Sequence, residues 1–213
     1  SNRLNVAIFG SMQHGKSTFI CTASSTFAGK YQTLAKSLYN PNQTVTTQFN
    51  EINIMNPPEG TRNNYIKFID TFGIRCRPNH DATKPFFSQS NYASCLGPFL
   101  SGRLTPGYKE WETVDENKFV KNTTINNRIH AIAFIVDVVA IQQDTQLNIV
   151  KEFLEQLIQT HGYKPLIIFT KCDIIMQSNL DKKIKPRMKN IYDCKTLDEA
   201  IEHFVEKIAI VDR

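Results

Sequence analysis

The sequence predicts an α/β fold in which a mostly parallel sheet carries helices on both faces. Continuous apolar segments alternate with amphipathic segments along the chain, and this alternation is typical of parallel strands joined by helices. A segment at about 49–55 alternates apolar and polar residues, which predicts one antiparallel strand at an edge of the sheet.

Length and composition narrow the class of protein. The 213 residues are 41% hydrophobic and 21% charged, which suits a single domain over residues 1–213 with a real core. No apolar run approaches the roughly 20 residues that a membrane span needs, so we expect no transmembrane segment. The five cysteines are widely spaced without a Cys-x-x-Cys pair, which favours a reducing compartment.

The net charge of +5 is modest for a chain of this size. Its one dense basic run, at residues 182–189, is interpreted as a solvated surface, with a membrane-surface or localisation patch as the alternative. We therefore expect no nucleic-acid partner.

The first part of the chain predicts a strand, a helix and a hairpin. Residues 4–9 form a short apolar strand, and a helix begins near Gly15. Residues 51–54 alternate as a half-exposed strand, and residues 65–70 return beside it.

An insertion at about 74–128 separates this part from the rest of the domain. It holds several prolines and has weak periodicity, and it is too long for an ordinary loop, so we expect a helix at about 86–100. Beyond it the pattern predicts a strand at 129–136, a helix over 147–158 and a strand at 165–170.

A capping box predicts the start of the last helix. In this box the side chains of Thr196 and Glu199 would satisfy the first free backbone N–H groups of the helix. Its expected apolar stripe consists of Leu197, Ile201, Phe204, Val205 and Ile208. No further strand is recognisable after Asp173, so the last strand of the fold is expected to be missing.

The first chemical motif lies between the first strand and the first helix. Residues 10–17 match the pattern Gly-x-x-x-x-Gly-Lys-Ser/Thr in full and in the required context, although the glycines could also serve an ordinary turn. In such a loop consecutive N–H groups point at phosphate oxygens. Lys16 would reach the outer phosphates, and the Ser17 hydroxyl would hold Mg²⁺. The candidate nucleotide-binding residues here are Gly10, Ser11, Met12, Gln13, His14, Gly15, Lys16, Ser17 and Thr18.

His14 sits inside this loop. An imidazole there could contact phosphate or a neighbouring subunit, but we interpret His14 as a solvent-facing loop residue.

A phosphate loop needs a second anchor for Mg²⁺, usually an aspartate at the end of an apolar strand. Asp70 and Asp137 both fit that description. Asp70 is followed by Gly73 in an Asp-x-x-Gly arrangement, whose glycine N–H can contact the terminal phosphate, whereas no such loop follows Asp137. We therefore choose Asp70 for the metal and Gly73 for the phosphate.

A threonine between the first helix and the edge strand should complete the metal site and sense the third phosphate. Thr46 and Thr47 both lie there, and their spacing does not separate them from each other or from ordinary strand-favouring residues. The candidate Mg²⁺ ligands are thus Ser17, Thr46, Thr47 and Asp70, and the candidate catalytic residues are Lys16, Thr46, Thr47 and Gly73.

A base-reading motif follows the strand at 165–170. Thr170, Lys171 and Asp173 resemble the Asn/Thr-Lys-x-Asp motif of GTP-binding proteins. In that motif the aspartate accepts two hydrogen bonds from guanine and the lysine stem covers a ring face. Adenine presents the wrong donors, so guanine is favoured over adenine.

With these motifs in order, the chain resembles a P-loop GTPase of the translation-factor-related (TRAFAC) class. The finer resemblance is to the G domain of the interferon-induced protein 44 family, through residues 100–108, residues 128–134 and the Thr-Lys-x-Asp form of the base motif. The resemblance implies a three-layer P-loop NTPase fold and a cytoplasmic GTP-binding domain that can sit beside other domains.

We therefore expect a protein that binds GTP or GDP with Mg²⁺, hydrolyses GTP slowly and switches conformation. Ile74 follows Gly73, where many signalling GTPases place a water-orienting glutamine. Arg75 and Arg77 could stabilise charge within one subunit or across a homodimer, or could be surface residues. The alternative is a nucleotide-binding interaction module with negligible hydrolysis, whose output goes to a protein effector.

Overall fold

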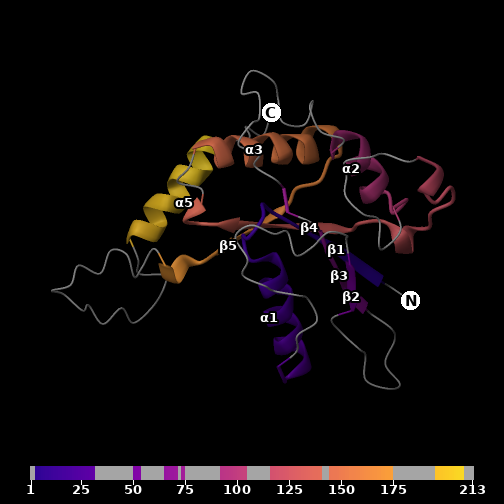
Figure 1. Cartoon of the computed structure of the whole chain (residues 1–213), viewed down its shortest axis with the longest axis horizontal. Coiled ribbons are helices and arrows are strands. Elements are labelled where there is room, and N and C mark those ends of the chain that lie inside the picture. The colour runs from indigo at the N-terminus through magenta and orange to yellow at the C-terminus, as the bar shows by residue number, and fades with distance from the viewer. Residues whose placement is uncertain are drawn as a thin grey trace.

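A five-stranded sheet with helices on both faces organises the described part of the chain (Figure 1). The computed structural model describes residues 3–31, 50–53, 65–71, 73–74, 92–104, 116–140, 144–174 and 195–208. The strands are β1 (Arg3–Phe9), β2 (Asn50–Asn53), β3 (Tyr65–Asp70), β4 (Ala131–Asp137) and β5 (Leu166–Thr170). The helices are α1 (Lys16–Ala28), α2 (Tyr92–Leu100), α3 (Asp144–Glu155) and α5 (Lys195–Ile208). Shorter helical turns are η2 (Glu116–Lys118), η3 (Ile125–Asn127) and the π-helical η5 (Gln156–Thr160), which continues α3.

The strand order is β2-β3-β1-β4-β5, with only β2 antiparallel to its neighbour. This confirms the predicted mostly parallel sheet with one antiparallel edge strand. The central strand β1 pairs on both sides, so that Val6 faces Phe68 on one side and Ala131 on the other. Because β1, β3, β4 and β5 are parallel, their carboxyl ends meet at one edge of the sheet. Within the described ranges β5 is the other outer strand.

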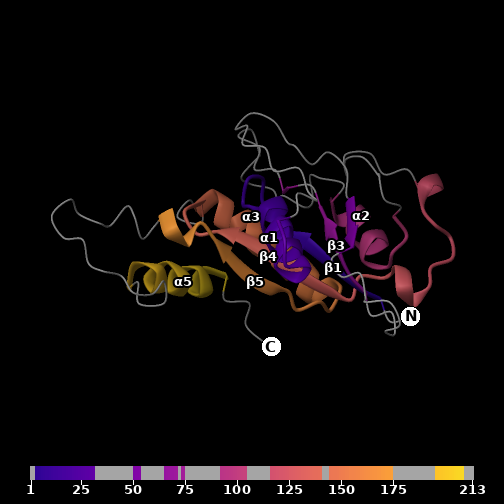
Figure 2. The same ribbon diagram turned by 90° about the horizontal axis from the view of Figure 1, so that it is seen from below.

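Two cores fill the space between the sheet and the helices. On one face α1 packs against the sheet, where Ile20 belongs to one cluster with Ile8 and Phe68. On the opposite face α2, α3 and α5 cover the sheet (Figures 1 and 2), and Phe153 contacts the Phe9 ring at 4.9 Å between centroids. The described residues thus form three layers, with helices on both faces as predicted.

The described part of the insertion belongs to the larger core. In α2, which ends where the sequence predicts, Cys95, Leu96 and Phe99 are buried against the strands. Phe119, just after η2, joins the same cluster. The insertion therefore supplies apolar surface to the face that α3 also covers.

Two expectations about α5 are wrong. The helix begins at Lys195, so Thr196 lies inside its first turn rather than at the position before it. Val205 is exposed, because it is rotated by about 100° from its neighbour Phe204, whose face is the one that packs. Leu197, Phe204 and Ile208 are buried as predicted.

None of the helices within the described ranges is long and apolar enough to cross a membrane.

Candidate functional site

The polar residues singled out by the sequence gather at the carboxyl ends of the parallel strands. Residues 10–15 join β1 to α1, and residues 71, 73 and 74 follow β3. Asp137 ends β4, and Thr170 ends β5. Ligands of open α/β sheets bind at this edge.

Gly10 and the start of α1 shape the loop at residues 10–17. Gly10 has φ 145°, and a Cβ there would lie 2.3 Å from the carbonyl oxygen of Ile135, so the position requires glycine. Gly15 is the N-cap of α1 and provides no side-chain cap, and the first turn holds no acidic residue. The helix therefore presents a positive, uncapped N-terminus that suits an anion.

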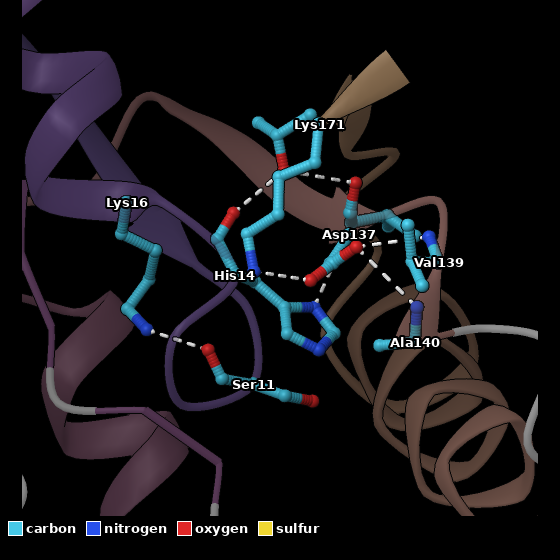
Figure 3. Close-up of polar contacts among 9 residues, drawn as sticks. Ser11, His14, Lys16, Asp137, Val139, Ala140 and Lys171 are labelled. Carbon is cyan, nitrogen blue, oxygen red and sulfur yellow. Dashed lines mark hydrogen bonds and ion pairs between the residues drawn. The ribbon is translucent and has the colours of Figure 1, made fainter. Parts of the chain in front are cut away.

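Lys16 is buried beneath this loop. Its Nζ donates hydrogen bonds to the carbonyl oxygens of Gly10 at 3.1 Å and Ser11 at 2.9 Å, the second of which is drawn in Figure 3. Burial lowers the pKa of Lys16 to about 8, and the nearby Asp70 carboxylate partly opposes that change. An anion placed beside Nζ would favour the charged amine.

Ser17 and Asp70 connect α1 to the end of β3. The Ser17 hydroxyl donates to Asp70 Oδ2 at 3.0 Å, and Asp70 is only 3% exposed. Burial raises the pKa of Asp70, while Lys16 and the Ser17 hydrogen bond lower it. Among the described residues no hydrogen-bond donor reaches Asp70 Oδ1. A buried carboxylate oxygen without a donor, beside a serine hydroxyl, fits the oxygen ligands that Mg²⁺ prefers.

The segment after β3 is attached directly to the loop at residues 10–17. Ile74 donates its N–H to the Gly10 carbonyl at 3.1 Å and accepts the Met12 N–H at 3.3 Å. A Cβ on Gly73 would lie 2.6 Å from Met12 Cα, so only glycine allows this approach. The Ile74 side chain is buried in the core and therefore does not face the loop.

The predicted base-reading motif at residues 170–173 also contacts the loop at residues 10–17. The Thr170 hydroxyl donates to the His14 carbonyl at 2.7 Å, and Lys171 Nζ lies 2.5 Å from Asp137 Oδ2. The Asp173 side chain is exposed. Segments 156 residues apart in sequence are thus joined side by side.

His14 is not the solvent-facing residue that the sequence suggested. Its side chain is 2% exposed, and Nδ1 accepts the Asp137 N–H at 3.2 Å. The reason lies in strand lengths: β1 pairs with β4 only as far as Phe9 and Phe134, so β4 extends beyond β1. Since Val138 donates its N–H toward β5, the Asp137 N–H points to the other side, where the imidazole receives it.

Asp137 is the site residue that sequence reasoning undervalued. It satisfies the description that selected Asp70, an aspartate at the end of an apolar strand, and the structure places it beside the same loop. Its position at the end of an apolar strand, which it shares with Asp70, is the sequence feature that could have identified Asp137 as a site residue.

Several predicted site residues lie outside the described ranges, namely Thr46, Thr47, Arg75 and Arg77. Within the described ranges no three His, Cys, Asp or Glu side chains cluster as a metal site, so Ser17 and Asp70 are the described candidates to hold Mg²⁺.

A scan against models of known protein families finds no match for this chain, and a search of curated protein sequences finds no significant match.

Proposed function

We propose that this chain is a P-loop GTPase-like domain that binds GTP or GDP with Mg²⁺, hydrolyses GTP slowly and acts as a conformational switch. The observation that carries the proposal is the convergence of three separate motifs at one sheet edge. Lys16 lies under the loop, Ser17 bonds to Asp70, and Thr170 bonds to the His14 carbonyl.

The phosphate end of a nucleotide would bind at the N-terminus of α1. The uncapped first turn supplies backbone N–H donors, and Lys16 supplies a cation whose hydrogen bonds to two loop carbonyls already hold it in place. Ser17 and Asp70 would hold Mg²⁺, which neutralises phosphate charge when it is bound.

The base end would bind at residues 170–173. The exposed Asp173 carboxylate can accept two N–H groups of guanine, and the Lys171 stem would cover a ring face. The Thr170 hydroxyl holds this segment against the phosphate loop, so that one nucleotide could reach both ends. Adenine would leave the carboxylate without its donors.

The switch element would be the segment at Gly73 and Ile74. Its two backbone hydrogen bonds to Gly10 and Met12 place it against the loop, where the Gly73 N–H could respond to a terminal phosphate. Since Ile74 is an aliphatic side chain buried in the core, this position cannot orient water, and hydrolysis should be slow.

The buried aliphatic side chain of Ile74 also favours the second candidate, a nucleotide-binding interaction module with negligible turnover. Single-turnover hydrolysis of GTP, measured at low and high protein concentration, separates the two. A rate above the water background, rising with concentration, supports a GTPase stimulated by a second copy. A rate at the background at every concentration supports the module.

The base assignment has its own test in Asp173→Asn. We expect this variant to prefer xanthine over guanine nucleotides, because the amide presents a donor where the carboxylate presented an acceptor. Asp198→Asn, an exposed carboxylate on α5, is the matched control and should keep the guanine preference. Unchanged GDP affinity in Asp173→Asn would rule out this base-reading role.

A further inference from the structure

Both side-chain oxygens of Asp137 accept hydrogen bonds, one within its own turn and the other from a separate loop (Figure 3). Oδ1 accepts the N–H groups of Val139 at 2.9 Å and Ala140 at 3.3 Å, which closes the turn after β4. Oδ2 faces the amine of Lys171 at 2.5 Å. The backbone N–H donates to His14, and the residue as a whole is 5% exposed. One buried aspartate therefore connects the phosphate loop to the base-reading segment.

Lys171 is fixed at both ends of its side chain. Its backbone has φ 57°, a left-handed conformation that non-glycine residues seldom adopt, and its amine is held by Asp137. The Lys171 side chain is nevertheless 35% exposed, whereas its partner carboxylate is buried. The methylene stem thus lies between two fixed points with part of its surface open.

We propose that Asp137 is a positioning residue for base recognition, which tethers the Lys171 amine so that the lysine stem forms a preformed apolar wall for the guanine ring. The proposal rests on the proposed function. A lysine that is already restrained loses less side-chain freedom when a ring packs on it, so the tether should strengthen base binding. Phosphate binding at Lys16 should not depend on it.

The substitution Asp137→Asn separates this role from the turn-closing role. The amide oxygen of asparagine can still accept the N–H groups of Val139 and Ala140, as Oδ1 does. The amide nitrogen that replaces Oδ2 cannot accept from the Lys171 amine, so only the tether is lost.

The test is calorimetric titration of the nucleotide-free chain with GDP and, separately, with inorganic pyrophosphate, both with Mg²⁺. We expect Asp137→Asn to weaken GDP binding about five- to tenfold, the range for one side chain losing its preorganisation, and to leave pyrophosphate binding unchanged. The matched control is Glu51→Gln, which removes a carboxylate from the Lys67–Glu51 ion pair between β2 and β3. It should leave both affinities unchanged. Equal losses for both ligands in Asp137→Asn, or no loss for either, would overturn the tether.

Lys171→Met keeps an apolar stem and removes the amine, and it tests the same idea even if Asp137→Asn does not fold. It should weaken GDP binding by a similar factor, and adding Asp137→Asn to it should cause no further loss. Wild-type GDP affinity in Lys171→Met would overturn the tether. If the unaltered chain binds no guanine nucleotide, both proposals fail; if it binds GDP and Asp137→Asn binds GDP equally well, only the tether fails.

Discussion

Two aspartates end the strands on either side of β1, and their surroundings differ. Asp70 ends β3 and Asp137 ends β4, and both are almost fully buried. Asp137 satisfies both carboxylate oxygens with groups of the protein, whereas Asp70 has one oxygen that no described donor reaches. An unsatisfied buried carboxylate oxygen costs stability unless a ligand uses it. The comparison therefore separates an aspartate with an oxygen that a ligand could use from one whose oxygens are both satisfied by the protein.

The largest expected effect is the loss of GDP affinity in Lys16→Met, a variant of the buried lysine near Asp70. Removing the amine should weaken GDP binding about 100-fold, a loss of roughly 3 kcal/mol for charge-assisted hydrogen bonds to phosphate. Thermal stability should change less than GDP affinity, because removing a buried charge offsets part of the loss of the hydrogen bonds to the Gly10 and Ser11 carbonyls. Titration calorimetry and thermal melts check both parts. Lys30→Met, an exposed lysine just after α1, is the matched control and should bind GDP normally.

The hydrogen bond from the Asp137 N–H to His14 is tested by comparing His14→Ala with His14→Asn. Alanine leaves the buried Asp137 N–H without an acceptor and should lower the free energy of unfolding by about 1–3 kcal/mol. Asparagine places an oxygen the same number of bonds from Cα as Nδ1, so its loss should be smaller. Urea unfolding measures both. Equal losses in the two variants would mean that this hydrogen bond does not stabilise the fold.

Asp70→Asn tests whether the Asp70 carboxylate, one oxygen of which no described donor reaches, binds Mg²⁺. If Asp70 helps to hold Mg²⁺, this variant should reduce the gain in GDP affinity that Mg²⁺ produces, about tenfold relative to the unaltered chain. The measurement is GDP binding with Mg²⁺ and with a chelator. Asp137→Asn is the natural comparison, and its ratio of affinities should match that of the unaltered chain. A normal ratio in Asp70→Asn would remove the distinction between the two aspartates.

The smallest effect is a pH dependence of GDP binding in the presence of a chelator. Lys16 has a pKa near 8 in the empty protein, and phosphate oxygens should raise it, so binding takes up a proton above pH 8. Affinity should therefore fall by about tenfold between pH 7 and pH 9. The weaker binding of Lys16→Met should not show this fall, and an identical fall in that variant would assign the effect to another group.

The sequence predicted the parts of the site that are local along the chain. Gly10, Lys16 and Ser17 belong to one contiguous pattern between a strand and a helix, and Gly73 follows Asp70 within a few residues, so spacing alone placed them. The mostly parallel sheet with one antiparallel edge strand followed from the alternation of apolar and amphipathic segments.

The rest depended on contacts between distant segments. His14 is buried because β4 extends past the end of β1, and the register of two strands more than 120 residues apart cannot be read from the loop itself. The ion pair of Asp137 with Lys171 depends on β4 and β5 being neighbours of a given length. Val205 was misplaced because an apolar residue beside a buried one need not share its face.

The central claim is that one guanine nucleotide joins the phosphate loop to the base-reading segment. The most direct measurement is titration of the nucleotide-free chain with GDP and with ADP under the same Mg²⁺ concentration. We expect GDP to bind at least about tenfold more tightly than ADP, because only guanine supplies the donors that Asp173 requires. Equal affinity for the two nucleotides, or binding of neither, would contradict the claim.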